Sequence, residues 1–271
     1  MFSITKLIIL IRKITLSVII LCSLFFASCR TINIIDTNEK LGIPPSTVIF
    51  TFDDGPNQHE ETTARLLDVL NKYQVKGVFC VLGVNVLKYP DIIRRIFNEG
   101  HIIVNHGFSD KFSIFMNDDE FKTNLLLADR AISDTLGADY NPKLYRPQGG
   151  VYNSRQKQIL DEEGYLVVPF TVNVIDVFTT SSGQKRLAKR IINKVLKQNS
   201  GIILLHDGRA AERRERSLNR NPRGSFNRSW IPDLVEEIII TLLDNGFNVN
   251  ESFGLIDVLT PSVSAPPQSP L

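Results

Sequence analysis

Short apolar runs alternate with segments in which apolar residues recur every three or four positions along most of the chain. The runs predict seven strands, over residues 47–52, 75–82, 102–104, 143–146, 165–174, 201–205 and 247–249. The segments between them predict helices over 60–73, 90–100, from 117 onward, 154–163, 183–198 and 232–244. Strands that alternate with helices at this spacing indicate parallel pairing with right-handed crossovers, in either a barrel or an open doubly wound sheet.

Several helix boundaries carry signals of their own. Residues Leu66, Val69, Leu70 and Tyr73 fall on one apolar stripe of the first helix. Pro90 opens the second helix, and Asn117 and Glu120 have the spacing of a capping box at the start of the third. These signals support the helical interpretation independently of the apolar pattern.

The first 28 residues differ in composition from the rest of the chain. A basic segment ends at Arg12-Lys13, and the apolar run from Ile14 to Ala27 has 14 residues. A membrane-spanning helix needs roughly 20. The following Phe26-Ala27-Ser28-Cys29 resembles a bacterial lipoprotein box, although Phe26 replaces the usual Leu. We expect residues 1–28 to be a lipoprotein-type signal peptide and Cys29 to carry a lipid anchor, with ordinary secretion or an uncleaved signal anchor as alternatives.

The formal net charge of +2 comes from this segment. Without Lys6, Arg12 and Lys13, 28 basic residues face 29 acidic ones, which argues against nucleic acid as a partner. Residues 29–46 are expected to be a tether, 47–260 a globular domain, and the proline- and serine-rich residues 261–271 a disordered tail. Cys80 lies in an apolar run, which indicates a buried side chain rather than a disulfide.

Polar, titratable side chains stand at the ends of five apolar runs. They are Asp53 and Asp54, then His106 and Asp110, then Arg146, Asp176 and His206. Because the carboxyl ends of parallel strands share one face, we expect these side chains to lie together. Asp53 and Asp54 are adjacent, so both can serve one pocket only if the strand ends there and the backbone turns at Gly55-Pro56.

The order of these segments resembles the five motifs of the polysaccharide deacetylases, the NodB-homology proteins of carbohydrate esterase family 4. The matching stretches are Thr51-Phe-Asp-Asp-Gly-Pro56, Gly100-His-Ile-Ile-Val-Asn-His106, Arg146-Pro-Gln-Gly-Gly150, Asp176 and Leu204-Leu-His206. The resemblance covers residues 47 to about 258 and implies a distorted (β/α)7 barrel, in agreement with the seven expected strands.

The resemblance also implies metal-assisted removal of acetyl groups from a glycan. Asp54 and His106 are implied as metal ligands, and their oxygen and imidazole donors suit zinc, with cobalt or another transition metal as alternatives. Asp53 is implied as the general base, and Arg146 as the residue that holds it in place and ionised. The oxyanion is implied to lie on the metal and on a backbone N–H near Gly149.

On the leaving-group side, His206 is implied as the general acid that protonates the amine. Asp176 is implied as the carboxylate that orients His206 and favours its imidazolium form.

The chain departs from the family pattern at three places. Asp110 replaces the second motif's last His, so an Asp-His-Asp metal site is expected, or else a site that has lost a ligand. Gln148 and Gly149 replace the third motif's Pro and Tyr, which removes an aromatic wall but keeps the backbone amide. Val177 stands where the fourth motif usually has Trp, so a more open pocket is expected.

Residues 208–229 carry seven Arg against two Glu. They are interpreted either as a solvated loop or as an Arg-rich lip that contacts an anionic glycan through paired hydrogen bonds. Trp230, at the edge of this insert, is expected to plug the barrel, with stacking on a sugar ring as the alternative.

The chain is therefore expected to be an exported, metal-dependent deacetylase that acts on N-acetyl or O-acetyl groups of a glycan such as peptidoglycan or a chitin-like oligosaccharide. Its expected place is the bacterial cell envelope. Two alternatives remain: a catalytically weak relative that binds glycan, and an amidase that acts on a small non-sugar amide.

Overall fold

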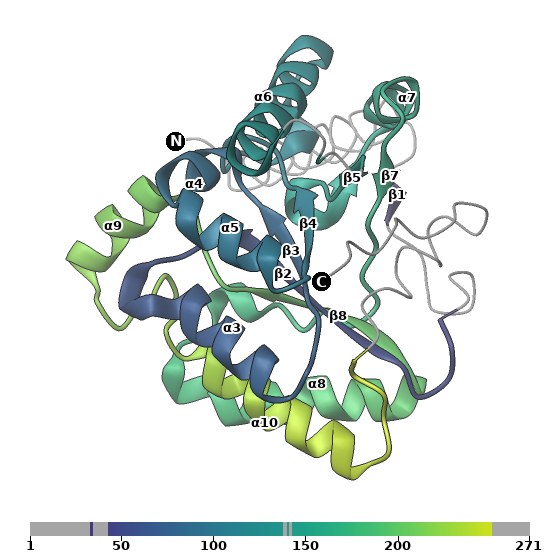
Figure 1. Ribbon diagram of the computed structural model, residues 1–271, viewed down its shortest axis with the longest axis vertical. Coiled ribbons are helices and arrows are strands. Elements are labelled where there is room, and N and C mark those ends of the chain that lie inside the picture. Colours follow the sequence, from purple (N-terminus) through teal and green to yellow (C-terminus); the bar gives the residue numbers. More distant parts are fainter. Residues whose placement is uncertain (1–32, 35–42, 138–139, 141–142, 251–271) are drawn as a thin grey trace, which may run out of the picture.

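A computed structural model describes residues 33–34, 43–137, 140 and 143–250 and shows a six-stranded sheet among helices (Figure 1). The strands follow the order β7 (Leu166–Val167), β5 (Leu144–Tyr145), β4 (Ile102–Asn105), β3 (Val78–Val81), β2 (Val48–Gly55) and β8 (Gly201–His206). Each pairs in parallel with its neighbours, as the sequence predicts. A separate antiparallel pair joins β1 (Asn33–Ile34) to β6 (Val151–Tyr152).

The two edges of the sheet are joined by the segment that continues from β7. The backbone N–H groups of Thr171 and Val172 both donate to the carbonyl of Ile202 in β8, at 3.0 Å. The start of this segment pairs with β5 and its end with β8, so the sheet closes into a distorted barrel of the (β/α)7 type. The strand predicted over residues 247–249 is wrong, because this stretch forms only a single β-bridge, between Thr47 and Asn248.

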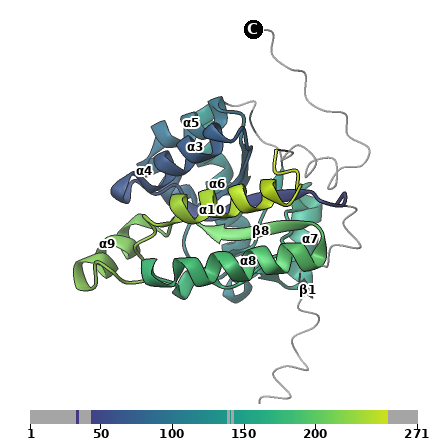
Figure 2. The same cartoon turned by 90° about the horizontal axis from the view of Figure 1, so that it is seen from below.

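Helices cover the outside of the barrel. Their bounds are α3 (Thr62–Lys72), α4 (Gly83–Lys88), α5 (Pro90–Asn98), α6 (Asp118–Leu136), α7 (Ser154–Glu162), α8 (Gln184–Gln198), α9 (Ala211–Arg220) and α10 (Ile231–Asp244). Short 3₁₀ turns span His59–Glu61, Ser113–Phe115, Gln148–Gly150, Asp176–Phe178 and Ser181–Gly183. Figure 2 shows α8 and α10 running side by side across β8. The sequence pattern predicts all of the α-helices except α4 and α9.

The start of α6 confirms the predicted capping box. The Asn117 side chain accepts a hydrogen bond from the Glu120 backbone at 2.9 Å, and Glu120 accepts one from the Asn117 backbone at 3.1 Å. Two N–H groups that the first helical turn leaves without partners are thereby satisfied.

Alternate strand residues face the two sides of the barrel wall. Phe50, Phe52, Phe79, Ile103 and Leu205 pack outward against the helices, and Ile49, Val78, Cys80, Val104, Leu144 and Ile202 form a second cluster inside the barrel. Cys80 is buried and unpaired, as expected. Trp230 is 4% exposed, and its indole N–H donates to the Asn227 carbonyl at 2.8 Å. It belongs to the outer cluster, so it neither plugs the barrel interior, as expected, nor presents a face to a sugar.

Among the described residues, no helix combines the length and the apolar character that crossing a membrane requires. The expected signal peptide, most of the tether and the expected tail lie outside the described residues.

Candidate active site

The predicted site residues gather at the carboxyl ends of the parallel strands. Asp53, His106, Arg146 and His206 follow the interior residues Ile49, Val104, Leu144 and Ile202 by two or four positions, so strand alternation directs all four inward. One cavity of about 390 Å³ is lined by five predicted residues, Asp53, Asp54, His106, Asp110 and His206. Arg146 and Asp176 are buried behind this surface.

Asp54 reaches the same cavity as Asp53 because the backbone of β2 is irregular there. The register between β2 and β3 shifts between Asp53 and Gly55, and Asp54 has a φ of 67°, in the left-handed region. A bulge of this kind redirects a side chain, and Asp is among the residues that tolerate positive φ. A bulge inside the strand, rather than the predicted end of the strand, therefore brings both carboxylates to one pocket.

Arg146 holds Asp53 from behind the cavity. Its guanidinium donates to four oxygens: Asp53 Oδ1 at 2.8 Å, Thr51 Oγ1 at 2.6 Å, Val168 O at 3.2 Å and Pro169 O at 2.7 Å. Burial acts to lower the pKa of Arg146, but the charge and hydrogen bond of Asp53, together with Cys80, outweigh it and the pKa is raised. The other oxygen of Asp53, Oδ2, lies 3.8 Å from His106 Nε2. Asp53 is thus a fixed carboxylate with its second oxygen on the His106 side.

Asp54 and His106 lie next to each other in the cavity lining, with Asp54 Oδ1 3.4 Å from His106 Nε2. His106 Nδ1 lies 2.7 Å from the Arg146 carbonyl, which can only accept, so Nδ1 carries a proton and the lone pair of the neutral ring is on Nε2. Burial acts to lower the pKa of His106, but Asp53 and Asp54 outweigh it and raise the pKa. Burial likewise acts to raise the pKa of Asp54, but His106 and Arg209 hold it below the usual range.

His206 stands on the other side of the cavity with Asp176 behind it. The Asp176 carboxylate accepts from His206 Nδ1 at 2.7 Å and from the His206 backbone N–H at 3.0 Å. Burial acts to lower the pKa of His206 and to raise that of Asp176. Their mutual attraction raises the pKa of His206, and together with the charge of Arg228 it lowers the pKa of Asp176 to about 2.

Arg228 joins this pair, and its role was not predicted from the sequence. It is fully buried, pairs with Asp176 Oδ2, and donates to the carbonyls of Asp176 and His206 at 3.1 and 2.9 Å. In the sequence Arg228 is one arginine among seven in a basic segment, and no local pattern distinguishes it from the others.

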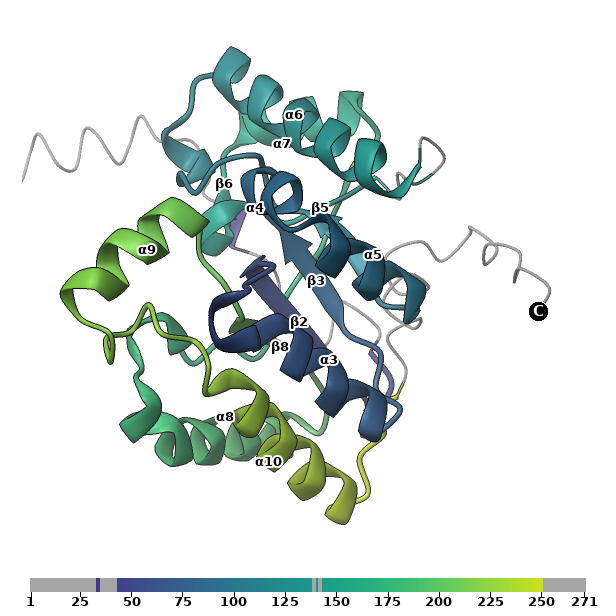
Figure 3. The ribbon, with the colours of Figure 1, turned by 60° about the vertical axis from the view of Figure 1, so that its left-hand side comes forward.

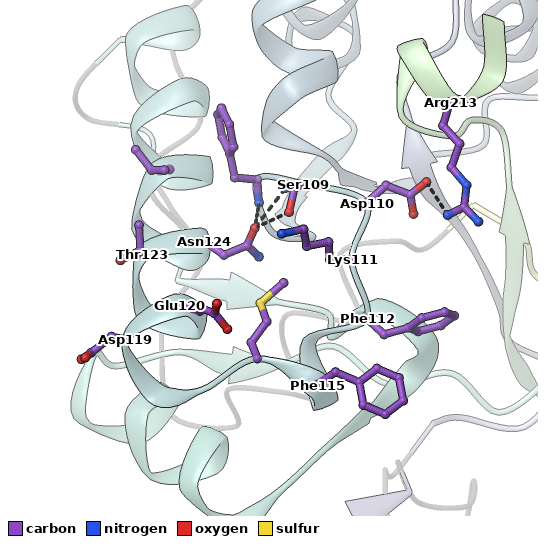
Figure 4. Close-up of a pocket in the computed structure, with 13 residues that line it drawn as sticks. Ser109, Asp110, Lys111, Phe112, Phe115, Asp119, Glu120, Thr123, Asn124 and Arg213 are labelled. Carbon is purple, nitrogen blue, oxygen red and sulfur yellow. Dashed lines mark hydrogen bonds and ion pairs between the residues drawn. The ribbon is translucent and has the colours of Figure 1, made fainter. Parts of the chain in front are cut away.

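Asp110 lines the cavity but does not join Asp54 and His106. Its carboxylate is held by Arg213, whose Nη1 lies 3.2 Å from Asp110 Oδ2 (Figure 4). Within the described part of the chain, no group of three His, Cys, Asp or Glu side chains is arranged to hold a metal ion. A metal therefore fits two of the predicted ligands, Asp54 and His106, by donor chemistry and proximity, and in this arrangement Asp110 is not a third.

The Arg-rich residues 208–229 fit neither of the two alternatives, a solvated loop or a lip that contacts glycan, along their whole length. Residues 211–220 form α9, which lies at the edge of the molecule beside α4 (Figure 3). Arg214 and Arg228 are buried, whereas Arg209 and Arg213 line the cavity and pair with Asp54 and Asp110. The expected solvated loop is therefore wrong for Arg209, Arg214 and Arg228, whereas the Arg213 side chain is 53% exposed.

The chain matches known proteins over the part of the site that precedes residue 168. The polysaccharide deacetylase family model matches residues 41–168. A crystal structure of a peptidoglycan N-acetylglucosamine deacetylase superposes with a TM-score of 0.60 at 30% identity, covering 76% of this chain and 86% of that one. The chain belongs to the polysaccharide deacetylase family.

Other members show the range of activities in this family. A peptidoglycan-N-acetylglucosamine deacetylase of Bacillus cereus is 34% identical over 161 residues, which is 59% of this chain and 55% of the relative. Chitin deacetylase 1 of Saccharomyces cerevisiae is 30% identical, over 58% of this chain and 51% of the relative. The chain thus spans about half the length of these curated relatives. A family 4 acetyl xylan esterase of Clostridium thermocellum, in complex with a cobalt ion, superposes with a TM-score of 0.59 at 28% identity, covering 78% of this chain and 91% of that one.

In this chain an aromatic residue from another loop lies where the third motif lacks one. Gly149 has a φ of 78°, and a Cβ there would come within 2.5 Å of the Phe112 ring. Phe112 therefore covers the space that a side chain at 149 would occupy. Beside Val177, Phe178 is 81% exposed and lines the same cavity. The cavity keeps aromatic walls although the usual positions have lost them.

Proposed function

We propose that the chain is a metal-dependent deacetylase that removes N-acetyl or O-acetyl groups from a glycan such as peptidoglycan or a chitin-like oligosaccharide. The strongest support is the placement of two sets of groups around one cavity: Asp54 and His106 beside the fixed carboxylate of Asp53, and His206 backed by Asp176. Relatives whose names describe peptidoglycan and chitin deacetylases support the substrate class.

Asp54 and His106 would hold the metal, for which zinc is proposed and cobalt is the alternative. When bound there, the ion acts as a Lewis acid that activates water and polarises the acetyl carbonyl. Asp53 takes the proton of the attacking water, and Arg146 keeps its carboxylate oriented for that step. Asp110 joins the ligands only if it leaves Arg213.

His206 supplies the proton to the leaving amine. Its Nδ1 is bound to Asp176, so the proton that it transfers is on Nε2. Asp176 fixes the ring and favours the imidazolium form. The backbone N–H of Gly149, at the cavity wall, is the proposed donor to the oxyanion.

The test is acetate release from chitin oligomers, peptidoglycan and acetylated xylan by purified protein supplied with zinc or cobalt. Asp53→Asn should abolish release while calorimetry still shows zinc binding, because the change removes the base and leaves Asp54 and His106. Asp91→Asn, at an exposed position in α5 paired with Arg94, is the matched control and should keep full activity. Acetate release by Asp53→Asn would contradict this mechanism.

The same panel, extended by small non-sugar amides, separates the alternatives. Glycan binding without release under either metal would indicate a catalytically weak relative. Release from small non-sugar amides alone would indicate an amidase.

We further propose that the protein acts outside the cytoplasm, anchored through a lipid on Cys29. Support comes from the composition of residues 1–28 and from relatives named for a cell-wall substrate. Labelled palmitate should enter the protein and should be lost in Cys29→Ser. Label that persists in Cys29→Ser would contradict anchoring at this residue.

A further inference from the structure

Each of the four carboxylates at the site forms an ion pair with one arginine. The pairs are Asp53 with Arg146, Asp54 with Arg209, Asp110 with Arg213, and Asp176 with Arg228. Three of these arginines come from residues 208–229, directly after β8. The acidic side chains of the site are therefore balanced before any cation binds.

The four arginines form two classes. Arg146 and Arg228 are enclosed and also donate to backbone carbonyls, so they are fixed parts of the fold. Arg209 and Arg213 line the cavity, with side chains 19% and 53% exposed. Both guanidinium groups lie 5.7 Å from the centre of the Phe226 ring, so both lie against the same aromatic side chain of the cavity lining. These two can change partners without disturbing the core.

A divalent cation at Asp54 and His106 changes this balance. Arg209 Nη1 lies 2.9 Å from Asp54 Oδ2, so the cation and the guanidinium would share one carboxylate and repel each other. The cation also adds two positive charges to a site in which an arginine already neutralises each carboxylate. In a partly enclosed cavity this excess favours an anionic partner.

We propose that Arg209 and Arg213 form an anion subsite, which binds a carboxylate carried by the glycan when a cation occupies Asp54 and His106. This inference rests on the proposed function, because it takes Asp54 and His106 as the metal ligands. Guanidinium groups that line one cavity suit a carboxylate, which accepts paired N–H donors. Cation and acidic glycan then bind cooperatively, and each raises the affinity of the other by the same factor.

The position of Arg213 suits a polymer. A second cavity of about 800 Å³ lies beside the first, between the loop 108–116 and α6 (Figure 4). Asp110, Phe112 and Arg213 line both cavities. A glycan chain can therefore continue from the acetyl site into the larger cavity while its acidic group stays on Arg213.

Calorimetric titration of zinc into the purified protein tests the coupling. N-acetylmuramic acid and N-acetylglucosamine are the probes, because they differ by a lactyl group that bears a carboxylate, and free lactate is the third arm. We expect N-acetylmuramic acid to tighten zinc binding about fivefold or more and N-acetylglucosamine to leave it unchanged. Equal zinc affinity with the two sugars, or the full gain with lactate alone, would overturn the assignment.

Two variants on α9 test whether this tightening of zinc binding depends on Arg213. Arg213→Gln should reduce the coupling to below twofold, while Arg216→Gln should keep it. Arg216 is a matched control because its side chain is 68% exposed and pairs with Glu212 on the same helix, 3.9 Å away. Coupling that survives Arg213→Gln would refute the subsite.

Failure of this inference can be told apart from failure of the proposed function. Acetate release without coupling between zinc and N-acetylmuramic acid would refute the subsite but support the deacetylase function. Coupling between zinc and N-acetylmuramic acid without acetate release from any of the glycans would support the subsite but refute the deacetylase function.

Discussion

Arg146→Met would remove the arginine that neutralises Asp53 and leave a carboxylate buried without a partner. Asp53 is 4% exposed, and the guanidinium of Arg146 is inaccessible to solvent. Removing one member of a buried ion pair costs about 3–5 kcal/mol. The carbonyls of Val168 and Pro169 also lose their donors, at about 1–3 kcal/mol for each group left unsatisfied. The expected loss is at least about 5 kcal/mol, a large part of the roughly 5–15 kcal/mol that is typical of a domain.

Urea denaturation followed by circular dichroism measures this loss, in the presence of a chelator so that metal binding does not contribute. Arg146→Lys keeps the charge but cannot reach all four acceptors, so it should lose less, roughly 1–3 kcal/mol. The double variant Asp53→Asn/Arg146→Met removes both charges and should recover part of the loss. A loss below about 1 kcal/mol for Arg146→Met, or a double-mutant cycle without coupling, would refute the reasoning.

Two further predictions concern neighbours of the site. Burial raises the pKa of Asp207 from 3.8 to about 7, so its contribution to stability is present below pH 3.8 and is lost as pH rises to about 7. Asp207→Asn should therefore gain stability over the parent between pH 4 and pH 7, by at most about 4 kcal/mol, and a constant difference across this range in thermal denaturation would contradict the prediction. Arg228→Lys should lower kcat for acetate release about tenfold with little change in KM, because the single ammonium cannot hold Asp176 and two carbonyls together. Arg223→Lys, at an exposed position, is its control, and an equal loss in both would show that the effect is not specific.

Much of the fold could be predicted because it depends on local periodicity. Apolar runs located the six strands of the sheet, and the spacing of Asn117 and Glu120 located the start of α6. Strand alternation also explains why Asp53, His106, Arg146 and His206 meet, since each follows an inward-facing residue at an even offset. The shared cavity follows from that pattern once the strands are parallel.

The sequence did not predict the local structure where polar residues are buried or form an irregular backbone. The buried face of α9 is formed by Ala211, Arg214 and Leu218, which have helical spacing, but the arginine in the middle hides the stripe. The bulge at Asp54 has no signal of its own, because two adjacent acids before Gly-Pro fit a simple turn equally well.

The sequence by itself determined the order of strands and helices, the family resemblance and the set of titratable side chains at the strand ends. The tertiary structure decided which charges meet. Asp54 and Arg209 are 155 positions apart, and Asp110 and Arg213 are 103 apart. No periodicity spans such a distance, because periodicity records the geometry of a single helix or strand. These pairs depend on how the segment after β8 folds back over the barrel mouth, and that is set by packing between elements.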